Sequence, residues 1–422
     1  MNKFMILWIR EFISSIGSGM TAFALAIYVY EITGSAMWVS LTALLAFLPT
    51  VLMNPIGGIL ADRYDRRLIM ICGDSFSAIG LLYILFSIQS GYIGVLPIII
   101  GVALSSIFIG LLEPAFKATV TDLLTEDEYA KASGMIQIAG SAKYLISPVV
   151  AGLILSSTSV KVILLIDIAT IIVTVAAVTL LRRNMKSTKV MKENYHLFKE
   201  FKKGINAIFS DKAVWSLVLL MGFICFFIAF IQTLMTPMIL AFADSKTLGF
   251  MESLSAVGML IGGVIIGIFN IKKNHHIILT ISLMAAGALM SLIGTTTDIW
   301  LIIIYCILFF TSLPFINSCA EVLLRIQIPN AVQGRAWGLI GILTQLGFVF
   351  AYAICGVLAD YIFEPLLMEN GILANSIGML IGTGVGRGIG LMLIICGMII
   401  FTLGFIFGFN KNIKNITIIK DL

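Results

Sequence analysis

The stretch Gly58-Ile59-Leu60-Ala61-Asp62-Arg63-Tyr64-Asp65-Arg66-Arg67 places five charged residues between two long apolar runs, in a chain of which only 12% is charged. One run ends at Ala61 and the next begins at Leu68. Each is long enough to cross a bilayer as a helix, which takes about 20 residues. The pair Gly57-Gly58 permits close packing of helices near the end of the first run. The stretch is therefore predicted to be a tight turn in water between two membrane-spanning helices.

Composition supports a protein with many membrane spans. Hydrophobic residues make up 59% of the chain and the mean hydropathy is +1.07, whereas globular proteins are roughly 45–50% apolar. A net charge of +5 is compatible with nucleic-acid binding, but the basic residues fall in short loops between apolar runs. We therefore expect the lipid bilayer, and no nucleic acid, as a partner.

The hydropathy pattern predicts an all-α polytopic membrane protein with twelve transmembrane helices. The predicted spans cover residues 9–31, 36–61, 68–89, 93–116, 133–157, 160–181, 213–242, 247–270, 275–297, 299–324, 335–362 and 377–409. The last is long enough to contain a bend, for which its glycine-rich opening is suited.

The lysines and arginines predict the orientation. With the N-terminus in the cytoplasm, the inner loops and flanks, with Arg10 among them, collect all but four of the 27 basic residues. The exceptions are Lys143, Lys161, Lys246 and Arg387. This asymmetry is what the positive-inside rule requires of an even number of spans, so both termini are expected to be cytoplasmic.

A basic interval divides the chain into two sets of six helices. The predicted domains are an N-terminal bundle over 1–181, a linker over 182–212, a C-terminal bundle over 213–410 and a cytoplasmic tail over 411–422. Within the linker, Tyr195–Ser210 has apolar residues at helical spacing with lysines between them. This pattern indicates an amphipathic helix on the inner membrane face, with a soluble linker helix as the alternative.

The two halves resemble each other at an offset of 204 to 205 residues. Gly57-Gly58 recurs as Gly262-Gly263, and Lys131-Ala-Ser-Gly134 recurs as Arg335-Ala-Trp-Gly338. Such an ordered repeat is typical of transporters built by duplication. The repeat is imperfect, because the loop after Gly263 lacks the acidic residues found after Gly58.

The charged turn resembles the signature loop between helices 2 and 3 of the major facilitator superfamily, with Asp65 at a position where that pattern more often has glycine. Further segments, Tyr30–Ser35, Glu113–Phe116, Ile328–Arg335 and Gly382–Arg387, resemble the macrolide-efflux branch, grouped as a third family of drug:proton antiporters. In the fifth span, Ser147-Pro148 to Gly152 is weakly similar to the antiporter motif. The resemblance implies two six-helix bundles around a central cavity that opens alternately to either side.

The resemblance also implies that the charged turn is a cytoplasmic conformational gate. The candidate gate residues are Gly58, Asp62, Arg63, Arg66, Arg67 and Asp74. Asp62 and Arg66 are four residues apart and would face each other in a helical turn, and Asp74 would join their charge cluster by its similar depth. The alternative is that the basic residues only orient the loop.

Three carboxylates are candidates for proton coupling because charges at membrane depth are costly and are therefore functional candidates. Glu113 with Lys117, and Glu321 with Arg325, have the spacing of an ion pair within one helix, so a local pair is the alternative. The third is Asp167, roughly 10 Å from the outer end of its span at 1.5 Å per residue. Lys143, near the middle of the fifth span, is expected to pair with it or to find another partner.

Polar residues at mid-depth are candidates for the cavity or the substrate site. These are Gln137, Lys143, Gln232, Asn317 and Gln345. The three histidines lie in predicted loops and the six cysteines show no metal-ligand spacing, so no metal and no cofactor are expected. The pair His275-His276 is predicted to be a solvated turn.

These observations predict a secondary transporter rather than an enzyme, since no nucleophile and base set is present. The primary hypothesis is proton-coupled efflux of hydrophobic drugs, with protons and a small hydrophobic substrate as partners, by a monomer in the cell membrane. The alternative is a dedicated exporter or importer of a single metabolite, such as a siderophore or a lipid-like compound.

Overall fold

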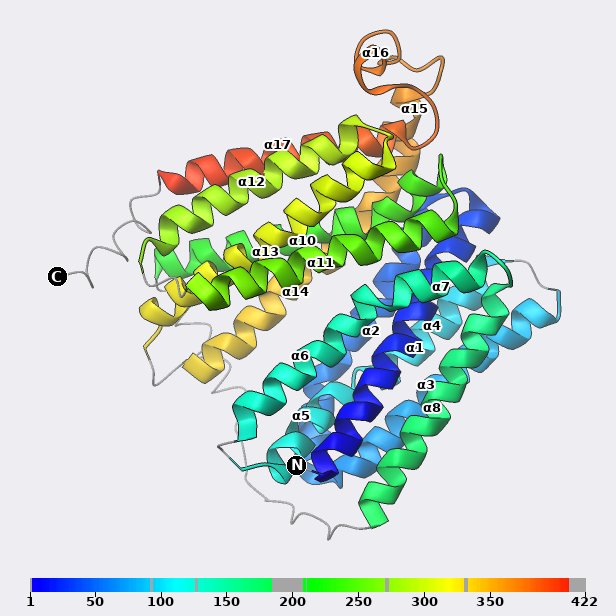
Figure 1. Ribbon diagram of the computed structural model, residues 1–422, viewed down its shortest axis with the longest axis vertical. Helices are drawn as coiled ribbons and strands as arrows, with labels where there is room; N and C mark the ends of the chain where they lie inside the picture. Colours follow the sequence, from blue (N-terminus) through cyan, green and yellow to red (C-terminus); the bar gives the residue numbers. More distant parts are fainter. Residues whose placement is uncertain are drawn as a thin grey trace. The chain divides into compact units, whose positions relative to one another are not determined.

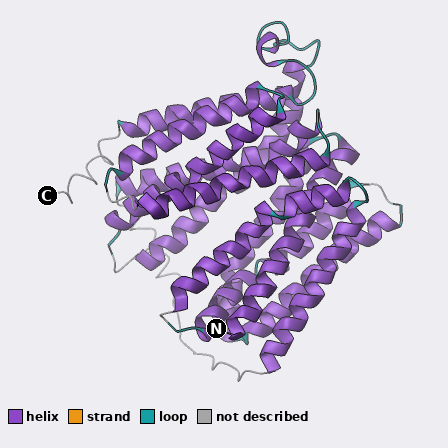
Figure 2. Ribbon diagram, in the orientation of Figure 1, coloured by secondary structure: helices purple, strands orange, loops and turns teal. Residues whose placement is uncertain are grey.

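The computed structural model describes residues 2–91, 94–125, 128–183, 208–209, 211–269, 273–329 and 333–409. Within these ranges every regular element is a helix (Figure 2). Twelve of them are long and apolar enough to cross a membrane, as the hydropathy pattern predicts. Most of the expected linker helix Tyr195–Ser210 and the tail after Phe409 lie outside the described residues.

The first six spans comprise eight helices, because two spans are broken (Figure 1). The helices are α1 (Asn2–Thr33), α2 (Ala36–Arg63), α3 (Arg66–Gln89), α4 (Val95–Ile109), α5 (Leu112–Leu123), α6 (Tyr129–Leu145), α7 (Ser147–Leu155) and α8 (Val160–Arg183). The fourth span breaks at Gly110-Leu111 and the fifth at Ile146. Pro148 explains the second break, because it lacks an N–H and disfavours helical geometry before it.

The other six spans begin after the linker. Their helices are α10 (Lys212–Leu240), α11 (Ser245–Phe269), α12 (His275–Thr295), α13 (Ile299–Gln327), α14 (Gln333–Leu358) extended by the π-helical turn η3 (Ala359–Phe363) and by α15 (Glu364–Leu367), and α17 (Arg387–Gly408). The predicted start of the twelfth span at 377 is wrong. Residues 378–381 form the separate short helix α16 (Gly378–Ile381), and positive φ angles at Gly382, Gly384 and Gly386 turn the chain before α17.

The chain divides into two compact units. One contains residues 1–194 and 243–253, and the other contains residues 195–242 and 254–422. The start of α11 thus groups with the first unit. In the first unit α1 packs against α8, α6 and α7, and its inner-end core includes Phe4, Leu7 and Met70.

Aspartates cap the N-termini of several helices in the second half, where their carboxylates accept hydrogen bonds from backbone N–H groups. The Asp211 carboxylate accepts from Ala213 at 2.8 Å, and that of Asp298 from Trp300 at 2.8 Å. Asp244 accepts from the Thr247 N–H at 2.9 Å, and its hydrogen bonds with Thr247 lower the pKa of its carboxyl. Such caps satisfy donors that have no partner within the helix.

The duplicated glycines have equivalent surroundings in the two halves. A Cβ on Gly57 would lie 2.9 Å from Leu111 Cα, at the break in the fourth span. Gly262 lies against Thr311 and Pro314 of the tenth span, whereas a Cβ on Gly58 or Gly263 would meet nothing within 4 Å in the described part of the chain. The first glycine of each pair therefore serves helix packing in corresponding places, as a duplication requires.

Candidate functional site

The charged turn between α2 and α3 is organised by Arg66. Its Nε donates to the Ala61 carbonyl at 3.1 Å and its Nη1 donates to the Ala118 carbonyl at 3.0 Å and pairs with Asp122 at 2.7 Å. Asp62 and Arg63 are exposed. The predicted Asp62–Arg66 pair is therefore wrong, because Arg66 reaches across to α5 and binds that helix instead. Arg67 is buried.

Asp65, the departure from the family pattern, has two partners. Its Oδ1 accepts the Arg67 N–H at 3.1 Å and so caps α3, and its Oδ2 pairs with Arg182 Nε at 3.0 Å. Arg182 lies in the last turn of α8. The turn is therefore tied to α8 as well as to α5.

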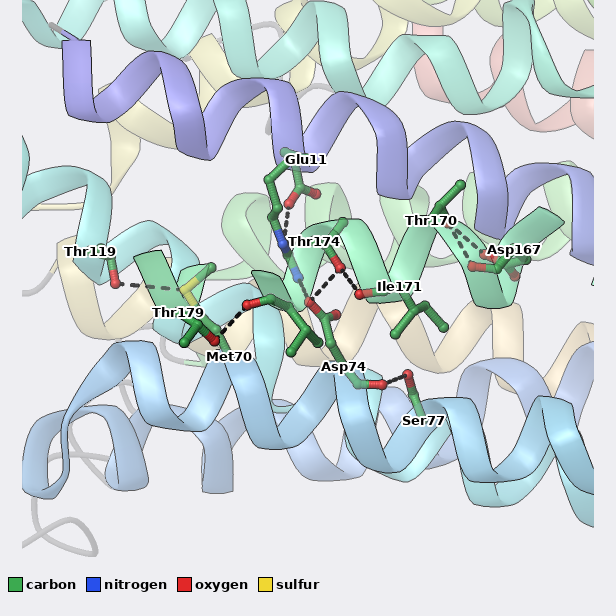
Figure 3. Close-up of polar contacts among 12 residues, drawn as sticks. Glu11, Met70, Asp74, Ser77, Thr119, Asp167, Thr170, Ile171, Thr174 and Thr179 are labelled. Carbon is green, nitrogen blue, oxygen red and sulfur yellow. Dashed lines mark hydrogen bonds and ion pairs between the residues drawn. The ribbon is translucent and has the colours of Figure 1, made fainter. Parts of the chain in front are cut away.

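Asp74 does not belong to the charged turn, which corrects the prediction from its depth. Its Oδ2 pairs with Arg10 Nη2 of α1 at 2.6 Å and accepts the Thr174 hydroxyl of α8 at 3.0 Å. Arg10 Nη1 also pairs with Glu11 at 2.7 Å. Figure 3 shows Glu11, Asp74 and Thr174 converging from three helices. We call Arg10, Glu11, Asp74 and Thr174 the inner cluster.

Asp167 of α8 is also buried, nearer the other end of that helix, where it contacts α1. Its Oδ2 accepts the Thr21 hydroxyl at 2.6 Å. Its Oδ1 accepts the Thr170 hydroxyl at 3.3 Å, a contact that Figure 3 shows. Lys143 is exposed and lies over the Tyr144 ring, 5.9 Å from its centroid. The predicted Lys143–Asp167 pair is therefore wrong, because threonine hydroxyls satisfy Asp167 instead.

The two predicted acid–base pairs differ. Lys117 Nζ lies 2.6 Å from Glu113 Oε1, which confirms the first pair, and Asn54 donates to the other Glu113 oxygen at 3.3 Å. The second pair is wrong, because Arg325 lies over the Trp337 ring, 5.5 Å from its centroid. Glu321 is exposed, and among the described residues no cation lies within ion-pair distance of it.

Several polar residues within the spans are exposed in their own unit. Gln137 of α6, Gln232 of α10 and Asn317 of α13 are exposed, and Gln345 of α14 is half-buried. Polar side chains at this depth avoid lipid and face protein or a water-filled interior. Their helix faces, together with those of Glu113 and Glu321, are therefore unsuited to contact with lipid tails.

The sequence interpretation missed Arg10 and Glu11 as site residues. It began the first span at residue 9, which made Arg10 a flanking charge. The span begins at Lys3, so Arg10 lies seven residues inside it, about 10 Å at 1.5 Å per residue. Adjacent opposite charges inside an otherwise apolar helix were the available signal.

The histidines form no site in the part of the chain that the structure describes. His275 and His276 are buried at the start of α12, where a His276 ring nitrogen lies 3.3 Å from the Phe407 carbonyl oxygen. The predicted solvated turn is wrong because α17 covers it. Across the described ranges, no three His, Cys, Asp or Glu side chains are grouped to hold a metal.

Comparison with known proteins agrees with this architecture. The pattern described as "Major Facilitator Superfamily" matches residues 7–352. The chain belongs to this superfamily. It is therefore a transporter with a small-molecule substrate and not an enzyme. The curated relatives include macrolide efflux protein A of Streptococcus pyogenes, 27% identical over 85% of this chain and 90% of the relative. The enterobactin exporter EntS of Escherichia coli O1:K1 is 22% identical over 80% of each chain.

A solved structure supports the fold. The nucleoside transporter NupG superposes with a TM-score of 0.75, covering 97% of this chain and 100% of its own, at 14% identity. Identity this low establishes the shared fold and carries no information about the substrate.

Proposed function

We propose that this superfamily member is a proton-coupled exporter of hydrophobic, macrolide-like amphiphiles that works by alternating access. The observation that carries the proposal is the exposure of carboxylates and amides within the spans of both halves, with Glu113 and Gln137 in the first and Glu321, Asn317 and Gln232 in the second. Similarity to macrolide efflux protein A supports the substrate class. Similarity to an enterobactin exporter favours the second candidate, a dedicated exporter of one metabolite.

In the proposed mechanism the carboxylates are the energy-coupling groups and the amides orient the substrate. A carboxylate that takes up a proton loses the cost of burying its charge, so protonation favours the conformation that shields it. Glu321 and Asp167 are the principal candidates because neither is paired with a cation within the described residues. Glu113 is a weaker candidate, since Lys117 already neutralises it. Gln345 and Lys143 complete the proposed substrate-facing set.

The charged turn is proposed as the cytoplasmic gate. Gly58, Asp62 and Arg63 supply exposed atoms at the end of α2, while Arg66 and Arg67 hold the start of α3 in place. The ties from Arg66 to Asp122 and from Asp65 to Arg182 would make α2, α3, α5 and α8 move together. Asp74 is excluded from this proposal by its contacts with α1 and α8.

A first prediction tests transport directly with erythromycin as the probe. Everted membrane vesicles containing the intact protein should accumulate erythromycin, and collapse of the proton gradient should abolish this accumulation. Glu321→Gln should lose most of the activity, because an amide has no group that ionises at physiological pH. Glu369→Gln, at an exposed residue between α15 and α16, is the matched control and should retain it.

Two outcomes would contradict this function. Accumulation that persists without a proton gradient would end the claim of proton coupling. Vesicles that accumulate no erythromycin or other macrolide, but do accumulate an iron-free catecholate siderophore, would replace the multidrug proposal with the dedicated exporter.

A further inference from the structure

The inner cluster contains one more carboxylate than it has cations. Arg10 contributes one positive charge, and Glu11 and Asp74 contribute two negative charges, all joined by contacts of 2.6 to 2.7 Å. Glu11 and Asp74 have Arg10 as their one cation within ion-pair distance in the described part of the chain. With every group ionised, the cluster would therefore hold a net charge of −1.

The cluster lies well inside the spans. Arg10 is seven residues from Lys3, Asp74 eight from Arg66 and Thr174 nine from Arg183. At 1.5 Å per residue each depth is about 10 to 14 Å, roughly a third of a hydrocarbon core about 30 Å thick. The three helices therefore bring these side chains to one level, where water is scarce and an uncompensated charge is costly.

Burial divides the roles of the two carboxylates. The Asp74 side chain is 3% exposed, and one of its oxygens accepts from both Arg10 and Thr174. Asp74 is therefore enclosed and held by donors from two other helices. The Glu11 side chain is 29% exposed and, within the described residues, accepts from Arg10 alone. Glu11 is thus the more accessible of the two carboxylates.

We propose that the inner cluster is a proton-binding site, with Glu11 as the group that takes up and releases the proton. Glu11 accepts a proton from hydronium, forming a neutral carboxylic acid and water, and the charges of Arg10 and Asp74 then cancel. Interacting groups titrate as a unit, so the proton belongs to the cluster and enters through Glu11. This inference deepens the proposed function, because it adds a coupling site to the candidates already named.

A second observation shows that the cluster is not a fully satisfied structural ion pair. Arg10 is 3% exposed, and its buried Nε has no hydrogen-bond partner among the residues that the structure describes. A purely structural arginine at this depth is expected to have its donors satisfied. The open donor leaves room for the contacts of Arg10 to rearrange when Glu11 changes charge.

Other titratable groups near α1 are engaged elsewhere. On the helices packed against it, Glu113 and Lys117 pair with each other, Lys143 lies over Tyr144, and Asp167 accepts from Thr21 and Thr170. The remaining charged side chains on these helices lie near their ends: Asp62, Arg63, Asp122, Lys131, Lys161, Arg182 and Arg183. On α3, Arg66 pairs with Asp122 of α5, and the next residue, Arg67, is buried.

Infrared difference spectroscopy of the purified full-length protein tests this proposal without any substrate. Acidification should produce the carbonyl band of a protonated carboxylic acid that is absent from the Glu11→Gln protein. Asp74→Asn should also remove this band, because loss of either carboxylate neutralises the cluster. Arg10→Gln should have the opposite effect and shift the band to higher pH, since two carboxylates would then face each other without a cation.

The matched control is Glu31→Gln, which replaces an exposed glutamate near the other end of the same helix and should leave the band intact. Monodisperse elution of each variant shows that it folds. A band that persists unchanged in both Glu11→Gln and Asp74→Asn would overturn the proposal. The result is independent of erythromycin transport, so the cluster and the proposed function can fail separately.

Discussion

Asp65 stands at a position of the α2–α3 turn where the superfamily pattern more often has glycine. Its carboxylate caps α3 through the Arg67 N–H and pairs with Arg182. Glycine would provide neither contact. The pair is partly exposed, with 45% of the Arg182 side chain open to its surroundings, so the cap is expected to contribute more than the charge pair.

Substitution of Asp65 separates these two effects. Asp65→Ala removes the cap and the ion pair, and should lower stability by about 1 kcal/mol, the usual cost of losing a helix cap. Asp65→Asn keeps a capping oxygen and loses only the charge, so its unfolding temperature in detergent should stay close to that of the intact protein. An equal loss in both variants would show that the ion pair with Arg182 dominates.

Helices α12 and α17 pack through glycines spaced seven residues apart, and they lie side by side in Figure 1. A Cβ on Gly294 would collide with the Gly390 carbonyl oxygen, and one on Gly287 would collide with the Gly397 carbonyl oxygen and the Phe401 N–H. These contacts are backbone to backbone, so no side chain can move aside. The glycines therefore allow the backbones of α12 and α17 to lie in direct contact.

Gly294→Ala should therefore destabilise the second unit, at about 1 to 3 kcal/mol for an overpacked site. Gly267→Ala on α11 is the matched control, because nothing lies within 4 Å of its Cβ position. The control should be neutral or slightly stabilising, since alanine is the better helix former. Thermal unfolding in detergent compares the two variants. An unchanged midpoint for Gly294→Ala would show that α12 and α17 can move apart without loss of stability.

The twelve spans give the whole molecule two chemically different sides. Basic residues gather at the ends of the spans predicted to be cytoplasmic, such as Arg63 and Lys273. The segment between η3 and α17 carries exposed apolar side chains, with Ile372 87% and Leu380 85% exposed. No lysine or arginine occurs from residue 364 to 386. The positive-inside rule therefore predicts that this segment lies outside the cell.

Labelling of introduced cysteines in intact cells tests that orientation. Asn375→Cys should react with a membrane-impermeant maleimide, whereas Lys273→Cys should react only after permeabilisation. The parent protein provides the background, which should be low because its six free cysteines are buried or half-buried within spans. Reaction of Lys273→Cys in intact cells would invert the predicted topology.

The sequence by itself determined the number of spans, the orientation expected for them, the duplication and the family. These properties depend on local composition. About 20 consecutive apolar residues can form a span wherever they occur, and a basic residue beside a span favours the cytoplasmic side for the loop that carries it. Glu113–Lys117 was predictable for the same reason, because one helical turn joins the two residues.

Only the tertiary structure decided which buried charges meet. Arg10 and Asp74 are 64 positions apart, and their contact depends on how far along its span each residue lies and which helix face it occupies. From depth alone, Asp74 was expected near Asp62, and Lys143 near Asp167. In the packed structure Asp74 contacts Arg10 instead, and Asp167 contacts Thr21. In a membrane every buried charge needs a partner, and the arrangement of the helices selects which one it finds.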